Sequence, residues 1–568
     1  MNNLNFLVDV LKESPVFKTL EKNVKPGRTV CASGLSTINK SNIIYALCRL
    51  KGVTAFCLAS DEKEAQTLCN DLSCMGLRAY VYPVRDFNFL DFQSRSHEYE
   101  HARLKVLLKL INHECDVAIA CVDAAAQLTV PRNVLEQSVI EFEEGRELSL
   151  EKATKALTLL GYERFDAVEG SGQFSLRGGI LDFFMPDSDY PVRCEFWGDE
   201  ITDLSYFDIE TQRRFKKADK ITLSPSTEIV IEDRAALADK IEHKAKLLRS
   251  KNSAKAKEKL FSEAELIRSG AMIANADKFI NQIYDKPESL FDYLDRNTLV
   301  FASEFTAIQE RGKSMDFISN ETLMQGFEDG TLCRGFDRFA LTFNECTEFL
   351  QSHGTIVLEN FVHGSMPIKL SEIISFSTKQ LSAWGGSYKQ LKEDVDGLFT
   401  PESKGVIFAG TERAAKNLCD TFNADGINAV YSEGADKISK GELLVMQGAL
   451  SAGFEYPSQK FFAITYSQVS YRPEKSKKKK KKTGQEIYSL SELAPGDYVV
   501  HNVHGIGVFG GIRKIDTHGV IKDYIKIDYA KGDVLYVPVT QLDMVAKYIG
   551  PKEDSRVKLN RLGSGDWQ

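Results

Sequence analysis

The chain has 568 residues, of which 43% are hydrophobic and 27% charged, as is usual for globular proteins. One hydrophobic core does not organise a chain of this length, so we expect several domains. The formal net charge of −8 argues against a surface built for nucleic-acid phosphates and favours protein partners. No apolar segment reaches the ~18 residues of a membrane span, and Asp9 and Lys12 precede any long apolar run. We therefore expect neither a signal peptide nor a membrane span, and a cytoplasmic location.

A metal site is not expected. The eleven cysteines include no C-x-x-C pair, and Cys69/Cys74 and Cys115/Cys121 lack zinc-site spacing. The stretch His97–His101 is a formal H-E-x-x-H, in which two histidines on one helix face could hold zinc. It has no third ligand at a familiar spacing, and acidic residues in the first turn of a helix explain it better.

The first 125 residues predict a parallel α/β domain. Short apolar runs alternate there with amphipathic segments, which is typical of a sheet whose strands are connected by helices. The predicted strands lie at 28–32, 53–58, 79–82 and 117–121, and the predicted helices at 40–51, 61–75 and 97–112.

A β-rich domain is predicted at 126–222, where short apolar runs are broken by Gly and Asp. Its strands are expected at 173–176, 179–184, 192–197 and 201–207. Segment 223–370 begins with lysine-rich helices at 233–283 and then resumes the first α/β domain. A further small α/β domain is predicted at 371–470, with strands at 405–410, 428–431, 443–447 and 461–464.

The remaining residues divide into three parts. The lysine-rich segment 471–487 repels itself and cannot bury a core, which indicates a linker. Residues 488–549 alternate apolar and polar side chains in short strands and predict a small SH3/Tudor-like β-barrel. The tail 550–568 is polar and lacks a capping element, so we expect this chain to be the front part of a longer protein.

A degenerate nucleotide site follows the first predicted strand. Gly34 to Ser41 nearly matches the phosphate loop G-x-x-x-x-G-K-[S/T], but Asn39 replaces the second glycine and would crowd the phosphates. A later strand, 299–302, runs into a serine where a Mg²⁺-binding aspartate is needed. Two defects in two motifs favour a relic without catalysis. Its residues are Gly34, Asn39, Lys40, Ser41, Ser303 and Glu304.

The β-rich segment has the composition of an interface. Arg177, Arg193 and Trp197 lie on neighbouring predicted strands, and arginine and aromatic side chains dominate interface hot spots. The alternative is that the two arginines only pair with local acids, among them Asp182, Glu195 and Asp199.

Two parts of the sequence resemble known families. The runs Gly161–Arg164, Arg177–Phe184, Phe196–Ile201 and Phe207–Arg213 resemble the UvrA-binding domain shared by UvrB and the bacterial transcription-repair coupling factors. A second set of runs is similar to the RNA-polymerase-interacting, CarD-like domain of the coupling factors: Pro495–His501, His504–Gly507, Asp523-Tyr524 and Leu535–Val539. In this order, the combination resembles the N-terminal half of a coupling factor over essentially the whole chain.

The resemblance implies a fold and an adapter function. The fold is an α/β multidomain one, in which a UvrB-like, helicase-type domain with decayed nucleotide motifs is interrupted by the UvrA-binding domain. The implied partners are UvrA, through Arg177, Arg193 and Trp197, and the RNA polymerase β subunit, through the strand that carries Ile515. Trp197 stands where the family usually has phenylalanine. The adapter would join a stalled polymerase to UvrA at damaged DNA, as a monomer without a cofactor. ATP, Mg²⁺ and most DNA contacts would belong to a translocase motor that this chain lacks.

Several alternatives remain open at this point. Ile515 could be an ordinary core residue, although Ile512 and Ile515 differ by three positions and so face opposite sides of a regular strand. The chain could be a stand-alone NTPase of helicase type that uses Lys40 and Glu304, or a CarD-like transcription regulator. UvrB itself fits less well, because it requires an intact phosphate loop and a Tyr-rich hairpin soon afterwards.

Overall fold

The structure is a computed structural model of the chain, and it describes residues 4–85, 97–137, 140–248, 253–270, 276–330, 332–362, 366–384, 387–466, 484–486, 496–501, 505–517, 520–530, 533–538 and 545–548. The chain forms two compact units, Met1–Val469 and Ser470–Gln568. Among the described residues no helix is both long and apolar enough to cross a bilayer. The predicted linker, apart from residues 484–486, and the predicted tail lie outside the described residues.

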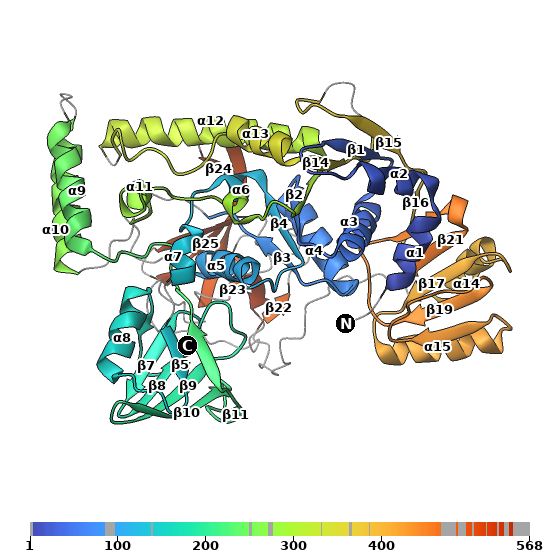
Figure 1. Cartoon of the computed structure of the whole chain (residues 1–568), viewed down its shortest axis with the longest axis horizontal. Helices are drawn as coiled ribbons and strands as arrows, with labels where there is room; N and C mark the ends of the chain where they lie inside the picture. The colour runs from blue at the N-terminus through green and yellow to red at the C-terminus, as the bar shows by residue number, and fades with distance from the viewer. Residues whose placement is uncertain are drawn as a thin grey trace. The chain divides into compact units, whose positions relative to one another are not determined.

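A seven-stranded sheet is the centre of the first unit (Figure 1), and all of its strand pairs are parallel. Its order is β15-β1-β14-β13-β2-β4-β3. The strands are β1 (Val30–Ser33), β2 (Ala55–Ala59), β3 (Ala79–Tyr82), β4 (Val117–Cys121), β13 (Leu299–Ser303), β14 (Thr355–Leu358) and β15 (Glu372–Ser375). The prediction of a parallel α/β fold is therefore confirmed. β15 follows the predicted boundary at 370 and still pairs with β1, so this sheet extends into the segment assigned to the next domain.

Both faces of this sheet are covered, which explains why its strands are short apolar runs. Alternate residues of β2 enter two separate cores: Cys57 joins the core of α3 and α4, whereas Phe56 and Leu58 join the core of α5 and α13. The helices concerned are α3 (Thr37–Lys51), α4 (Glu62–Cys74), α5 (Glu98–Ile111) and α13 (Phe343–His353).

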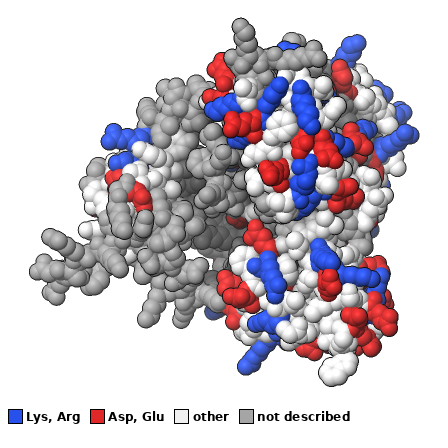
Figure 2. Space-filling view, turned by 90° about the vertical axis from the view of Figure 1, so that its left-hand side faces the viewer, with Lys and Arg blue, Asp and Glu red and all other residues white. Residues whose placement is uncertain are grey.

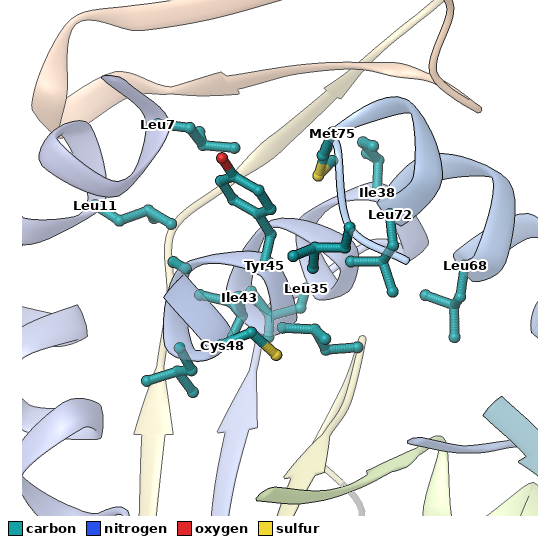
Figure 3. Close-up of a cluster of buried hydrophobic side chains, with 14 of the residues drawn as sticks. Leu7, Leu11, Leu35, Ile38, Ile43, Tyr45, Cys48, Leu68, Leu72 and Met75 are labelled. Carbon is teal, nitrogen blue, oxygen red and sulfur yellow. The ribbon is translucent and has the colours of Figure 1, made fainter. Parts of the chain in front are cut away.

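Helix α3 is buried along nearly its whole length, from Ile38 to Cys48. Figure 3 shows Tyr45 of α3 surrounded by apolar side chains, among them Leu7 and Leu11 of α1 (Asn5–Glu13) and Met75 at the end of α4. Helix α2 (Pro15–Asn23) follows α1. A helix covered on all sides has no face left for solvent. In the loop that precedes α3, Leu35 is buried, and Gly34 and Ser36 are partly buried.

A β-rich domain is inserted between β4 and β13, as the sequence predicts. Its six-stranded sheet has the order β11-β10-β9-β8-β7-β6, and one face packs with α8 (Leu150–Leu159) on a separate hydrophobic core. The strands are β6 (Glu163–Arg164), β7 (Gln173–Arg177), β8 (Ile180–Phe183), β9 (Val192–Trp197), β10 (Glu200–Phe207) and β11 (Arg214–Lys217). β5 (Ile140–Glu143) and β12 (Lys220–Leu223) form a two-stranded sheet beside them.

Helices connect this insert back to the central sheet. α9 (Arg234–Leu247) and α10 (Ser253–Ser269) pack on each other around a small core of their own, and α12 (Phe305–Asp329) is the longest helix described (Figure 1). The shorter helical elements are α6 (Val122–Ala126), α7 (Arg132–Gln137), η1 (Ala276–Phe279), α11 (Ile280–Ile283) and η2 (Leu290–Tyr293).

A second, mixed sheet has the order β16-β20-β21-β17-β19-β18. One face packs on α14 (Tyr388–Leu398) and α15 (Glu412–Ala424), whereas the other shares the core of α1 and α3. The second sheet is thus packed directly against the helices of the first. Its strands are β16 (Lys379–Leu381), β17 (Lys404–Phe408), β18 (Ala429–Ser432), β19 (Glu442–Met446), β20 (Gly453–Tyr456) and β21 (Phe461–Thr465), and η3 (Pro457–Gln459) joins the last two.

The second unit contains an antiparallel sheet of order β22-β27-β23-β24-β25-β26. Among the described residues its outer strands β22 and β26 do not pair with each other, so closure into a barrel stays a prediction. The strands are β22 (Gly484–Glu486), β23 (Tyr498–His501), β24 (Gly505–Thr517), β25 (Val520–Asp528), β26 (Val534–Pro538) and β27 (Val545–Tyr548).

Candidate functional sites

The degenerate nucleotide loop lies between β1 and α3, as the sequence predicts, and the amides of its first two residues are bonded to other segments. The amide of Gly34 donates to the carbonyl of Asn360 (3.2 Å), and that of Leu35 donates to the carbonyl of Glu359 (3.1 Å). A Cβ on Gly34 would lie 2.2 Å from the carbonyl oxygen of Phe376, and Gly34 has a φ of +78°. In a phosphate loop the amides that face the phosphates lie nearer the start of the following helix. The two amides at the start of this loop are bonded to neighbouring chain segments, which fixes where the loop begins.

Asn39 is also engaged internally. It is fully buried, its Oδ1 accepts from Ser36 Oγ (2.7 Å), and its Nδ2 donates to the hydroxyl of Tyr456 (3.3 Å). Asn42, one turn further along α3, donates to the same hydroxyl (3.0 Å). Burial raises the pKa of Tyr456 to about 12, so its hydroxyl stays neutral. Tyr456 is the last residue of β20 in the second sheet. Asn39, which replaces the second glycine of the loop, therefore also forms a hydrogen bond to that sheet.

Ser41 and its neighbour Asp71 make a second contact of this kind. The buried Asp71 carboxylate accepts from Ser41 Oγ (3.4 Å) and from the amide and hydroxyl of Ser451 (2.7 Å each). Ser451 precedes β20. In this chain the hydroxyl that would hold Mg²⁺ in a phosphate loop therefore faces a carboxylate of α4 and the second sheet.

We expect the replacement of Tyr456 by phenylalanine to lower the free energy of unfolding by about 1–3 kcal/mol, because it leaves two buried amide donors without an acceptor. Tyr431→Phe is the matched control. The buried hydroxyl of Tyr431 has no hydrogen-bond partner in the described part of the chain, so its removal should change the free energy of unfolding by less than about 0.5 kcal/mol. Urea denaturation measures both, and equal effects of the two variants would argue against the contact.

Lys40 lies at the centre of a buried charge cluster. Its Nζ donates to Glu304 Oε1 (2.6 Å), Ser303 Oγ (2.9 Å) and Glu64 Oε1 (3.3 Å), and its side chain is 2% exposed. Ser303 Oγ in turn donates to Glu64 (2.6 Å). Burial by itself would raise the pKa of Glu64, but the charge of Lys40 and hydrogen bonds from serines bring it below its usual value. The phosphate-binding lysine of the motif is thus satisfied by carboxylates.

Glu359 completes this cluster from the end of β14. Its Oε1 accepts from the amide of Phe305 (2.8 Å), at the start of α12. Burial, together with the charge of Glu304, raises the pKa of Glu359 to about 7. Among the predicted nucleotide residues, Lys40 therefore binds Ser303 and Glu304 directly, whereas Asn39 and Ser41 bond to Tyr456 and Asp71, which the sequence did not single out.

The H-E-x-x-H stretch serves as a contact between α5 and the segment that leaves the inserted domain. His97 Nδ1 lies 2.9 Å from Glu100 Oε2, and Glu100 Oε1 accepts from Thr227 Oγ1 (2.8 Å) and the amide of Glu228 (2.7 Å). The two histidine rings stack with centroids 5.9 Å apart. The carboxylate of Glu100 is thus bonded to the backbone and side chains around it.

The three predicted interface residues of the inserted domain lie on β7 and β9. Arg193 and Trp197 are on the same face of β9 because strand side chains alternate. Arg177 pairs with Ile180, which pairs with Glu195, so Arg177 lies at the Trp197 end of the sheet. The amide of Phe196 donates to the carbonyl of Gly179 (2.8 Å), which brings the β7–β8 turn and the β9–β10 turn together.

These three side chains differ in exposure. Trp197 is 83% exposed, and the side chains of Arg177 and Arg193 are 50% and 13% exposed, respectively. Both arginines donate to Asp182, a pairing that the sequence left open as the alternative. An exposed tryptophan beside an arginine is typical of a protein-binding surface.

The described part of one face of the molecule carries charges of both signs (Figure 2). Lys and Arg are interspersed there with Asp and Glu, without a field of a single sign. Such a mixture does not provide the continuous basic surface that a phosphate backbone requires.

The two edges of β24 in the second unit are paired over different lengths. β23 pairs with β24 only at residues Gly505–Val508, whereas β25 pairs with it as far as Thr517. In the described residues, the second half of β24 therefore has one neighbour, β25. Ile515 stands in this half, opposite Lys522, and its side chain lies outside what the structure describes. An edge strand with free amides and carbonyls is a template for a strand of another protein.

Sequence reasoning missed most of the partners that fill the nucleotide loop. The direct partners are Tyr456, Asp71 and Glu64, which bond to Asn39, Ser41 and Lys40. None of them belongs to a motif, and they come from segments up to 417 residues away from the loop. The one local signal was Asn39 itself, since a buried amide requires hydrogen-bond partners.

Comparisons with known proteins identify two domains. Residues 140–229 match the UvrB interaction domain, and residues 493–549 match the CarD-like/TRCF RID domain. The transcription-repair-coupling factor of Bacillus subtilis (strain 168) is 29% identical over 98% of this chain and 48% of that protein. The proteins of the same name from Staphylococcus haemolyticus (27%; 86% of this chain, 42% of that protein) and Staphylococcus aureus (strain MRSA252; 24%; 100% and 49%) are also similar. The chain spans about half the length of the curated relatives it matches.

Proposed function

Because the chain is a relative of the transcription-repair coupling factors and carries both a UvrB interaction domain and a CarD-like/TRCF RID domain, we propose that it is an adapter of transcription-coupled nucleotide excision repair. It binds the β subunit of a stalled RNA polymerase and recruits UvrA to the damaged DNA. The presence of both domains on one chain is the observation that carries this proposal, since neither alone would join the two systems.

Each partner is assigned to one surface. UvrA binds the end of the inserted sheet that carries Arg177 and Trp197, with Arg193 beside them. The polymerase β subunit adds a strand to the free edge of β24 near Ile515, in a domain that we expect to close into an SH3/Tudor-like barrel. We assign residues 126–222 to the UvrA-binding domain and 488–549 to the polymerase-binding domain, and we place the monomeric protein in the cytoplasm.

The first α/β domain acts as a scaffold in this proposal, and most DNA contacts belong to a translocase motor outside this chain. The alternative of a stand-alone NTPase finds no support in the loop geometry, where Lys40 is bonded to Glu304 and Glu64.

A bridging experiment tests the adapter function. Immobilised polymerase β subunit should retain purified UvrA only when this chain is added. We expect Trp197→Ala to weaken UvrA binding by at least about tenfold, because truncation of an exposed aromatic hot spot typically costs 2 kcal/mol or more. It should leave β-subunit binding and the melting temperature unchanged, since Trp197 is 83% exposed.

Tyr190→Ala provides a matched control in the same domain. Tyr190 is also an exposed aromatic residue (50%), but it lies two residues before β9, away from Trp197 at the strand's end. UvrA binding that survives Trp197→Ala, or that responds equally to both variants, would contradict the assigned surface.

A further inference from the structure

The two arginines of the proposed UvrA surface have different roles. Building on the proposed binding of UvrA, we propose that the buried Asp182 is a positioning residue that fixes Arg177 so that its free nitrogens bind a carboxylate of UvrA. Arg193 belongs to the support beneath this contact and does not carry the contact itself.

Asp182 lies at the centre of the outer face of the inserted sheet. Its side chain is 1% exposed, and it stands directly opposite Arg193 in the register of β8 and β9. Its Oδ1 accepts from Arg193 Nε (2.7 Å), and its Oδ2 accepts from Arg193 Nη2 and Arg177 Nη2 (2.8 Å each). A buried carboxylate with charged donors on both oxygens has a single arrangement and holds its partners in place.

Arg193 is held on all sides. Besides Asp182, it donates through Nη1 to the carbonyl of Gln212 (3.0 Å) and through Nη2 to the side-chain oxygen of Gln212 (3.1 Å). Its guanidinium lies over the ring of Phe207, 4.4 Å from the centroid. Four of the five N–H groups of an arginine are thereby used. Little of Arg193 remains for a partner protein.

Arg177 makes far fewer hydrogen bonds than Arg193 within the described residues. In the described residues its guanidinium makes one hydrogen bond, from Nη2 to Asp182, and half of its side chain is exposed. Nε and Nη1 make no hydrogen bond to the described residues, and Arg177 lies at the end of the sheet that carries Trp197. One carboxylate pairs with two guanidinium groups, so the cluster of Asp182, Arg177 and Arg193 has a net charge of +1. Arg177 is the more exposed of its two arginines. A planar guanidinium with free N–H groups matches a carboxylate in shape and in charge.

Fixing Arg177 before binding raises affinity. A free arginine has many rotamers, and ordering such a side chain at an interface lowers affinity by about two- to tenfold. The bond to Asp182 selects the rotamer in advance. Asp182 should therefore affect UvrA affinity only when Arg177 is present.

A double-mutant cycle in the full chain tests this coupling with purified UvrA as the ligand. Arg177→Gln is expected to weaken UvrA binding at least about tenfold and to make the affinity less sensitive to salt. Asp182→Asn is expected to weaken it by about three- to tenfold, and the double variant should bind within about twofold of Arg177→Gln alone. The proposal is overturned if the fold-losses of the two single variants multiply in the double variant. It is also overturned if a folded Asp182→Asn variant binds UvrA with unchanged affinity.

Two further variants keep the test decisive. If Asp182→Asn does not fold, Asp182→Glu retains the charge that balances Arg193 while displacing the oxygen that holds Arg177, and the same coupling is expected. Glu195→Gln is the matched control, because Glu195 lies on the same face of β9 and pairs with Arg214 instead of Arg177; its UvrA affinity should be unchanged. If the unaltered chain does not bind UvrA, the proposed function fails. If Trp197→Ala and Arg177→Gln both leave UvrA binding intact, the assigned surface is wrong, and the positioning role of Asp182 is wrong with it. If these two variants weaken UvrA binding and the Asp182 variants do not, only the positioning role fails.

Discussion

Replacement of Lys40 by alanine is expected to lower the free energy of unfolding by about 3–5 kcal/mol, because it leaves the mostly buried carboxylate of Glu64 and the partly exposed one of Glu304 without their cation. Lys40 is 2% exposed and bonds to Glu64 and Glu304 at 3.3 and 2.6 Å. The same variant is expected to leave ATP turnover at background, as in the unaltered chain, since Asn39 replaces the second glycine of the loop and Ser303 replaces the Mg²⁺-binding aspartate. Chemical denaturation and a phosphate-release assay measure the two quantities on one preparation.

Lys63→Ala is the control for this prediction. Lys63 is exposed on α4, one residue before Glu64, and its replacement should change the free energy of unfolding by less than about 0.5 kcal/mol. If the unaltered chain hydrolyses ATP and the Lys40→Ala variant does not, the site works and the interpretation of the loop as a relic is wrong. A fully stable Lys40→Ala variant would mean that the charge cluster does not stabilise the fold.

The second large effect is expected at Ile515, where substitution by arginine should abolish capture of the RNA polymerase β subunit. In the proposed complex a strand of the β subunit joins the second half of β24, and a charged side chain at this position disrupts the packing that accompanies main-chain pairing. The domain itself should remain folded. Capture of the full chain on immobilised β subunit measures binding, and hydrogen exchange of the amides of Tyr498–His501 reports on folding of the sheet.

Ile512→Arg serves as the comparison for Ile515→Arg. Ile512 stands at the register position opposite Ile525, which is fully buried, so a charge introduced there is expected to unfold the domain. Ile515 is three positions further and should face the other side of a regular strand. If Ile515→Arg unfolds the domain, Ile515 is a core residue. If the variant is folded and still binds the β subunit, both the site and the choice of strand are wrong.

The geometry around Arg193 changes what its substitution is expected to do. From the sequence, Arg193→Ala should weaken UvrA binding and leave the melting temperature nearly unchanged. In the structure Arg193 is 13% exposed and neutralises the buried Asp182. Its removal should therefore lower the stability of the inserted domain, and a loss of UvrA binding in that variant would not by itself assign a contact.

Much of the fold follows from local sequence pattern. The strands predicted at 79–82, 117–121 and 192–197 agree with β3, β4 and β9 at both ends. Their apolar or alternating runs are short and bounded by turn residues, so periodicity and length determine them. The decay of the nucleotide motifs is also visible in the sequence, because a phosphate loop depends on a few residues at fixed spacing.

The identity of the groups that fill the decayed loop, and the different roles of the two arginines, were decided by tertiary structure alone. Tyr456 reaches Asn39 across 417 positions of the chain because the second sheet packs on α3. Asp182 meets Arg193 across 11 positions because the register of β8 and β9 sets them opposite each other. Local pattern shows that a buried amide or carboxylate needs a partner, but only sheet register and the packing of distant segments determine which partner it finds.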